Sequence, residues 1–186
     1  MNRGCACGGT AQTENPSRVI KKMTVKKKII VIIAAAVAAY LLYRMAKKAG
    51  ELNTPGLNPI SGKITSKFGY RTAPTSGAST LHNGVDIAAT IGTQVISPWK
   101  GTVKKVWNDT TYGGGVSLAI LHNNKYRTGY CHLSSTLVEA GETVERGQVI
   151  ALTGNTGNTT GPHLHFTLTD PSGTKIDPQS MFDFKA

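Results

Sequence analysis

Four of the five histidines in this sequence lie in three short motifs whose residue types suit metal and acid–base chemistry. The motifs are His82-x-x-x-Asp86, the single His132, and the pair His163 and His165. Residues two apart on a β-strand face the same side, so each pair can present both side chains together if its stretch is extended. Imidazole and carboxylate groups bind Zn²⁺, and a catalytic zinc site uses three protein ligands and leaves a fourth position for water. Two histidines and one aspartate would complete such a set.

Each motif alone is weak evidence, because a single histidine is more often structural than a ligand. A Gly- and Thr-rich loop, Thr153–Gly161, runs directly into the second histidine pair, and this coincidence is far more specific. The loop lacks the Gly-Lys-Ser/Thr ending of a phosphate-binding loop, and the chain lacks the His-Glu-x-x-His motif of helical metalloproteases. The fifth histidine, His122, stands beside an expected Asn123–Asn124 turn, and we expect it to face solvent and bind no metal.

The elements expected to position these residues are short β-strands. Beyond Ile60 the chain alternates β-rich runs with turn residues, and no competing helical period appears. The sequence therefore predicts a mainly β, antiparallel domain. The runs predicted as strands are Thr93–Pro98, Gly101–Trp107, Val116–Leu121, Lys125–Cys131, Gln148–Leu152 and His163–Leu168.

Before this domain lies an apolar segment, Ile29–Tyr43, of fifteen residues without a charge. As a helix it would cover about 23 Å of a hydrocarbon layer of about 30 Å, and flanking lysines that reach the interface can make up the rest. The segment is followed by Arg44 and Lys47, whereas a signal-peptide cleavage site needs small residues. We predict an uncleaved transmembrane helix at residues 26–46 that contacts the lipid bilayer, with a cleaved signal peptide as the alternative.

The formal net charge of +11 is concentrated before the β-domain. Residues 1–59 carry ten basic and two acidic side chains (+8), and residues 60–186 carry eleven basic and eight acidic side chains (+3). Seven basic residues precede the apolar segment and three follow it closely, so the positive-inside rule predicts an inside N-terminus and a domain on the periplasmic or external side. Lysines beside an apolar stretch are explained by orientation and headgroup contacts, so no nucleic acid is expected as a partner.

Composition also predicts where the parts of the chain begin and end. The three cysteines, Cys5, Cys7 and Cys131, do not form a disulfide framework. Cys5 and Cys7 are expected to be unpaired thiols, with acylation or metal capture as alternatives. The predicted parts are a basic disordered tail at 1–25, the transmembrane helix at 26–46, a linker at 47–59 and the β-domain at 60–186.

Over nearly all of Ile64–Leu168, the sequence resembles the lysostaphin-type, or LytM-type, zinc metalloendopeptidases. The motifs that carry the resemblance are Ser66–Arg71, His82–Ala88, Gly101–Val103, Tyr130–Ser134, Gly147–Ile150 and Gly154–Phe166. The resemblance implies an antiparallel β-fold with an open groove, and peptides of bacterial peptidoglycan as substrate. It also implies one zinc ion held by His82, Asp86 and His165, with His132 and His163 as the catalytic histidines. Thr167 departs from the pattern, since many relatives carry Glu there.

A hydrolytic mechanism is expected from these assignments. Zn²⁺ lowers the pKa of bound water toward about 7, which makes a hydroxide nucleophile available at neutral pH. Because no zinc motif supplies a glutamate base, proton transfer to and from the water and the leaving amine falls to His132 and His163, in either order. Tyr130, two residues before His132, is expected either to contact the oxyanion or substrate or to lie in the core or groove wall.

Two rival functions start from the same residues. A LytM-like domain can be a non-catalytic activator of another wall hydrolase, but such domains usually lack ligand residues, and here all five site positions are filled. The chain can also be a membrane protein of a bacteriophage particle that opens the wall during entry, although its single anchor fits a host envelope protein equally well. The bond cleaved, glycyl-glycine or one between D-amino acids, depends on the groove loops.

Overall fold

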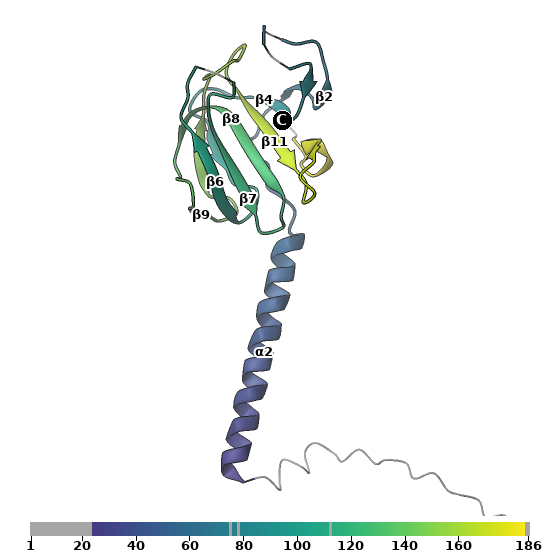
Figure 1. Ribbon diagram of the computed structural model, residues 1–186, viewed down its shortest axis with the longest axis vertical. Coiled ribbons are helices and arrows are strands. Elements are labelled where there is room, and N and C mark those ends of the chain that lie inside the picture. Colours follow the sequence, from purple (N-terminus) through teal and green to yellow (C-terminus); the bar gives the residue numbers. More distant parts are fainter. Residues whose placement is uncertain (1–23, 75, 78, 112, 185–186) are drawn as a thin grey trace, which may run out of the picture. The chain divides into compact units, whose positions relative to one another are not determined.

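The computed structural model of the chain describes residues 24–74, 76–77, 79–111 and 113–184 (Figure 1). The chain divides between Lys48 and Ala49 into two compact units. The expectations for Cys5, Cys7 and most of the basic tail lie outside the described residues.

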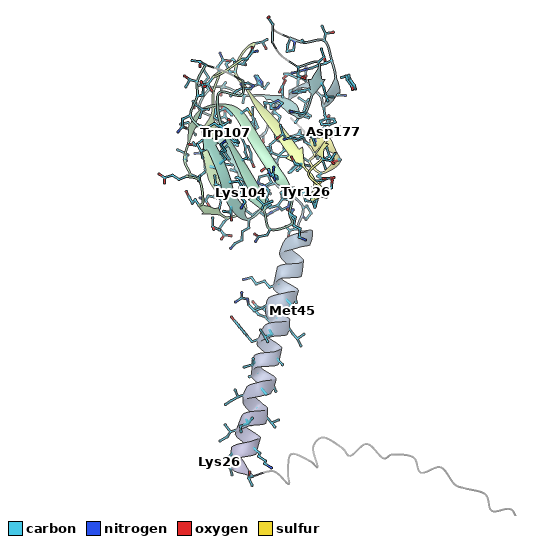
Figure 2. All side chains as sticks on the ribbon, viewed as in Figure 1. Lys26, Met45, Lys104, Trp107, Tyr126 and Asp177 are labelled. Carbon is cyan, nitrogen blue, oxygen red and sulfur yellow. The ribbon has the colours of Figure 1, made fainter. Side chains whose placement is uncertain are left out.

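Helix α2 (Val25–Asn53) contains the predicted membrane segment. Its part Val25–Lys47 is long and apolar enough to cross a membrane by length and composition, criteria that an N-terminal signal sequence also meets. The large apolar residues of this helix are exposed, and side chains project from both of its edges in Figure 2. The helix itself continues to Asn53, beyond the membrane segment predicted at 26–46, because helix-forming residues continue until Pro55 restricts the backbone before it.

Residues 54–59, the last part of the predicted linker at 47–59, are hydrogen-bonded to the β-domain. Trp99 donates its indole N–H to the Thr54 carbonyl at 2.8 Å, and the amide of Ile96 donates to the Pro59 carbonyl at 2.9 Å. Gly56 lies directly against the rings of Trp99 and Phe182, where a Cβ atom would be 2.6 Å from both. A residue without a side chain is therefore needed at this contact.

The β-domain is built on one ten-stranded sheet in which every recorded strand pair is antiparallel, as the sequence predicts. Its order is β1-β4-β11-β8-β7-β6-β9, with β10 paired to β5 and β8, and β12 paired to β11; β2 and β3 form a separate small sheet. Figure 1 shows β6, β7, β8 and β11 side by side. The bounds are β1 Ile64–Ser66, β2 Gly69–Tyr70, β3 Leu81–His82, β4 Val85–Ala88, β5 Gln94–Ile96, β6 Gly101–Trp107, β7 Val116–His122, β8 Arg127–Thr136, β9 Thr143–Val144, β10 Val149–Thr153, β11 His163–Thr169 and β12 Lys175–Ile176, followed by a 3-10 turn, η1, at Pro178–Ser180.

The alternation of side chains along β11 separates the core from the functional face. Leu164, Phe166 and Leu168 are fully buried in the hydrophobic core, whereas His163, His165 and Thr167 alternate with them and line a groove. Burying the apolar side chains stabilises the sheet by about 1.5–3 kcal/mol for each large side chain. Because the apolar side chains of β11 pack into the core, the polar side chains that alternate with them must point into the groove.

Candidate metal centre

Three of the predicted residues bring one ligand atom each to a single point. Nε2 of His82 lies 3.1 Å from Oδ1 of Asp86 and 3.0 Å from Nδ1 of His165. Nδ1 of His165 lies 2.7 Å from the same Asp86 oxygen. Among the described residues, this is the one cluster of histidine, cysteine and acidic side chains with metal-binding spacing. His82 and Asp86 are buried, and His165 is half-buried.

The hydrogen bonds around the cluster show why it suits a cation. The other ring nitrogen of His82, Nδ1, donates to the Lys67 carbonyl at 2.7 Å, and Nε2 of His165 donates to Oδ1 of Asn83 at 3.2 Å. In each neutral ring the nitrogen that faces Asp86 therefore carries a lone pair and no hydrogen. Three electron-pair donors then meet with no proton between them. Two imidazoles and one carboxylate are a donor set that Zn²⁺ accepts, so the residues fit the metal.

Asp86 is held as a carboxylate. Burial alone would raise its pKa, but the close approach of the His165 and His82 rings outweighs that effect and holds the pKa of Asp86 well below its usual range. Its second oxygen, Oδ2, accepts a hydrogen bond from Arg71 at 3.0 Å, and the same guanidinium nitrogen also bonds the Ser66 hydroxyl. Burial lowers the pKa of His165, which keeps that ring neutral and available as a ligand.

His82 and Asp86 do not lie on one continuous strand, because the extended stretch is interrupted between them. His82 ends β3 and Asp86 lies in β4, with Asn83 and Gly84 between the two strands. A Cβ atom on Gly84 would lie 2.4 Å from the Phe166 carbonyl, so only glycine fits at this position. On the other side of the centre, Asp86 pairs directly with His165 across the β4–β11 ladder, which places these two side chains together as an extended pairing predicts.

The remaining predicted residues, His132 and His163, lie beside the metal centre. Their rings are 4.7 Å apart, and Nε2 of His163 is 3.6 Å from Oδ1 of Asp86. Each ring donates its Nδ1–H to a backbone carbonyl: His132 to Thr156 at 2.8 Å and His163 to Gly161 at 2.8 Å. Both Nε2 atoms are thereby left as proton acceptors. Burial lowers the pKa of His132 to about 4, and the neighbouring His163 and His165 act in the same direction.

His132 owes its direction to an unusual backbone conformation. Its φ is +62°, in the left-handed region that residues with a side chain rarely adopt, and its amide donates to the Gly114 carbonyl at 2.7 Å. This kink interrupts the alternation of β8. His132 therefore lines the groove, although Tyr130 two residues earlier lies in the core.

An open groove of about 1210 Å³ passes over the metal centre. One wall comes from residues between Thr65 and Leu81, and the other from residues between Trp107 and Gly115 and between Asn158 and Pro162. The groove floor is the polar face of β7, β8 and β11. A cavity of this size and openness suits a peptide chain better than a small metabolite.

The structure does not support a substrate contact by Tyr130. The side chain is fully buried, it packs against Phe166 with ring centroids 5.4 Å apart, and its hydroxyl is hydrogen-bonded to Thr128 at 2.9 Å. Burial raises the pKa of this hydroxyl. Of the two predicted positions, Tyr130 takes the one in the core.

His122 is not the solvent-facing turn residue that the sequence predicts. It is 2% exposed, and its two ring nitrogens contact the Trp99 carbonyl at 3.2 Å and the Thr128 hydroxyl at 2.7 Å. The turn at Asn123–Asn124 exists, but β7 continues through His122 and points that side chain inward. It is not one of the three residues of the metal cluster.

Three groups that hold the centre have no predicted role. They are the Arg71 guanidinium, the Asn83 amide and the Lys67 carbonyl. Asn83 directly follows the predicted ligand His82, and Arg71 ends the Ser66–Arg71 motif of the family resemblance, so the sequence offered a reason to place both near the site. The Lys67 carbonyl belongs to the backbone and gave none.

Comparison with known proteins agrees with this geometry. The family model described as "Peptidase family M23" matches residues 80–178. The peptidoglycan DD-endopeptidase ShyB of Vibrio cholerae is 48% identical over 105 residues, which are 56% of this chain and 24% of that protein. This chain spans about a quarter of the length of the curated relatives that it matches first.

Solved structures show the same likeness. A zinc-containing peptidase from Vibrio cholerae has a TM-score of 0.60 at 39% identity and covers 72% of this chain and 40% of its own. The catalytic domain of lysostaphin from Staphylococcus simulans has a TM-score of 0.56 at 32% identity and covers 64% of this chain and 90% of its own. The resemblance to lysostaphin-type enzymes is thus confirmed. The chain belongs to peptidase family M23, a family of zinc metallopeptidases.

Proposed function

We propose that this protein is a zinc-dependent endopeptidase that hydrolyses peptide cross-links of bacterial peptidoglycan, with the metal held by His82, Asp86 and His165. The observation that carries the proposal is the convergence of Nε2 of His82, Oδ1 of Asp86 and Nδ1 of His165, which lie 2.7–3.1 Å from one another in a groove that can hold a peptide. Two curated relatives, ShyB and ShyA of Vibrio cholerae, are named peptidoglycan DD-endopeptidases. We therefore infer that the bond cleaved lies between D-amino acids.

The residues of the chain would share the proton transfers. When bound, Zn²⁺ supplies Lewis acidity toward the scissile carbonyl and acidifies a water molecule. The Nε2 atoms of His132 and His163 are bases beside this point, because each Nδ1–H is engaged by a backbone carbonyl. One such base accepts a proton from the attacking water, and an imidazolium formed there can protonate the leaving amine. Arg71 keeps Asp86 oriented and charged during the reaction.

The test is digestion of purified peptidoglycan by the full-length chain in detergent. The wild type should release soluble peptides, a chelator should stop the release, and added Zn²⁺ should restore it. His82→Ala should contain no stoichiometric zinc and release nothing. Mass spectrometry of the new termini identifies the bond. Unchanged release after complete removal of the metal would refute the proposal.

We also propose that α2 anchors the chain in a lipid bilayer, with the N-terminus inside and the β-domain on the outer side. The length and apolar composition of the helix support this, as does the excess of basic residues before it. In cells, the chain should stay in the membrane after carbonate extraction at its full mass, and external protease should reach the β-domain. A shortened, soluble product would instead indicate a cleaved signal peptide.

A further inference from the structure

Beyond the metal centre, the groove continues over a floor of small side chains. Ser117 and Ala119 of β7, Gly129 and Cys131 of β8, and Thr167 of β11 all line it. A Cβ atom on Gly129 would lie 2.6 Å from the Thr167 hydroxyl, so the floor is already closely packed at this point. Two charged side chains distinguish one end of this floor.

Two cations, Arg127 and Lys175, stand at that end and also line the groove. Arg127 pairs with Thr169 across the β8–β11 ladder, and Thr169 pairs with Lys175 across the β11–β12 ladder, so the two cations occupy one row of the sheet. The Lys175 ammonium donates to the Thr167 hydroxyl at 3.0 Å, which points it back toward the metal centre along β11. Thr167 is two residues, about 7 Å, from the ligand His165.

The charges of Lys175 and its neighbours act on one another at this end of the groove. Burial raises the pKa of the Cys131 thiol to about 11, and the positive charge of Lys175 opposes that rise. Burial lowers the pKa of Lys175, and Arg127 acts in the same direction. Cys131 is the cross-strand partner of His165. The ammonium is thus close to both Cys131 and Arg127, over the floor and beside the metal ligands.

The two cations lack an anionic partner within the part of the chain that the structure describes. Arg71 is ion-paired with Asp86 and Lys100 with Glu145, but neither Arg127 nor Lys175 forms an ion pair with a carboxylate there. Two like charges beside each other at a partly desolvated surface repel, and an anion between them would relieve that repulsion. A guanidinium and an ammonium are the groups that proteins use to bind carboxylates.

We propose that Arg127 and Lys175 form a carboxylate subsite that binds an acidic group of the peptide substrate within about two residues of the scissile bond. The inference deepens the proposed function and rests on it for the identity of the substrate as a peptide. The carboxylate can come from the end of a peptide or from an acidic side chain. Thr167 positions the ammonium by accepting its hydrogen bond, and both residues line the groove.

Binding of short peptides tests the subsite apart from cleavage. The parent protein is the full-length, zinc-loaded chain in detergent with His132→Ala, so that no peptide is hydrolysed. The probes are N-acetyl-D-alanyl-D-alanine, its neutral C-terminal amide, and N-acetyl-D-alanyl-D-glutamate with an amidated C-terminus. Calorimetric titration should show at least one acidic probe binding about tenfold more tightly than the neutral amide. The probe that does so identifies the source of the carboxylate.

Variants assign the preference to the two cations and not to the metal, which can itself attract a carboxylate. Lys175→Met and Arg127→Gln should each reduce the preference several-fold, and the double variant should abolish it. Thr167→Glu supplies a carboxylate from the chain itself and should have the same effect, whereas Lys175→Arg should keep the preference. Lys104→Met is the matched control, because it removes one exposed lysine of β6 that does not line the groove (Figure 2).

The outcomes separate this inference from the proposed function. Equal affinity of the parent protein for acidic and neutral probes, or a preference that persists in the folded, zinc-loaded double variant, would overturn the subsite. A clear preference that depends on Lys175, in a protein whose wild type releases nothing from peptidoglycan, would support the subsite and contradict the proposed function.

Discussion

His122 and His132 are two buried histidines with different surroundings. They are 2% and 8% exposed, and burial lowers the pKa of each to about 4. In each ring Nδ1 faces a backbone carbonyl, that of Trp99 for His122 and that of Thr156 for His132. The second nitrogen differs. In His122 it is bonded to the Thr128 hydroxyl, whereas His132 lines the groove beside His163.

The difference shows that burial and a shifted pKa do not by themselves mark a catalytic residue. His122 belongs to a closed chain of hydrogen bonds that continues through Thr128 to Tyr130, so its ring has no nitrogen left for chemistry. His132 is bonded on one side only, and its backbone adopts a strained φ of +62° to present the other side to the groove. Strain of this kind persists where the surrounding structure enforces it, and here it coincides with the candidate site.

The largest effect should come from removing the ring of His132. His132→Ala should lower kcat for peptidoglycan hydrolysis by about 10²–10⁴-fold, because a general acid–base group is lost. Bound zinc should stay stoichiometric, since the ring belongs to neither ligand motif. His132→Asn serves as the second variant, because asparagine tolerates a positive φ. Full activity in either folded variant would remove His132 from the mechanism.

Removing the ring of His122 should instead affect stability. His122→Ala should reduce the free energy of unfolding by about 2–4 kcal/mol, because it leaves a cavity beside Trp99 and takes one hydrogen-bond partner from the buried Thr128 hydroxyl. Urea denaturation measures the loss. Below the unfolding transition, zinc content and kcat should match the wild type, and a loss of either in folded protein would contradict a purely structural role.

The sequence predicted the main strands and the residues of the candidate site, but not the backbone details that direct their side chains. Alternating β-rich runs located β6 with its observed bounds and β11 to within one residue, because long strands buried on one face have a strong period of two. The strands from β1 to β4 are two to four residues long and carry too few alternations to be detected. The predicted ligands meet because the β2–β3 ladder holds His82 and the β4–β11 ladder holds Asp86 and His165. The sequence did not show that the strand is interrupted at Gly84.

The two-residue period of a β-strand does not predict which way the side chains near His132 point. Counting by twos from His132 gives Tyr130 the same face, and only the kink at φ +62° separates them. His122 was assigned to solvent because of the turn beside it, yet the strand continues one residue further and buries it. The positions of both side chains depend on backbone details set by contacts distant in sequence, with Gly114 and Trp99 as the partners.

The pH dependence of stability offers a smaller and more specific test of His122. Its pKa is about 4 in the folded protein and near 6.5 when unfolded, so the unfolded state takes up the proton first as the pH falls. The stability that the neutral ring contributes is complete above about pH 6.5 and is lost progressively toward pH 4, by about 3 kcal/mol in total.

His122→Asn, which does not titrate in this range, should lack that component. The difference in unfolding free energy between wild type and variant, measured by urea denaturation from pH 7.5 to 4 at one zinc concentration, should shrink or change sign as the pH falls. Protonation of the metal ligands occurs in both proteins and cancels in the difference. A difference that is independent of pH would show that His122 is already protonated, or equally accessible, in the folded state.

The smallest effect should come from the Tyr130 hydroxyl, at the end of the closed chain. Tyr130→Phe removes one buried hydrogen bond and leaves the Thr128 hydroxyl bonded to His122, so the free energy of unfolding should fall by about 1 kcal/mol. Because the ring lies on the core side of β8, kcat should stay within about twofold of the wild type. A loss of kcat of about a hundredfold, with KM unchanged, is what removal of an oxyanion donor would produce. That result would mean that β8 turns toward the groove during catalysis and that the Tyr130 hydroxyl then contacts the substrate.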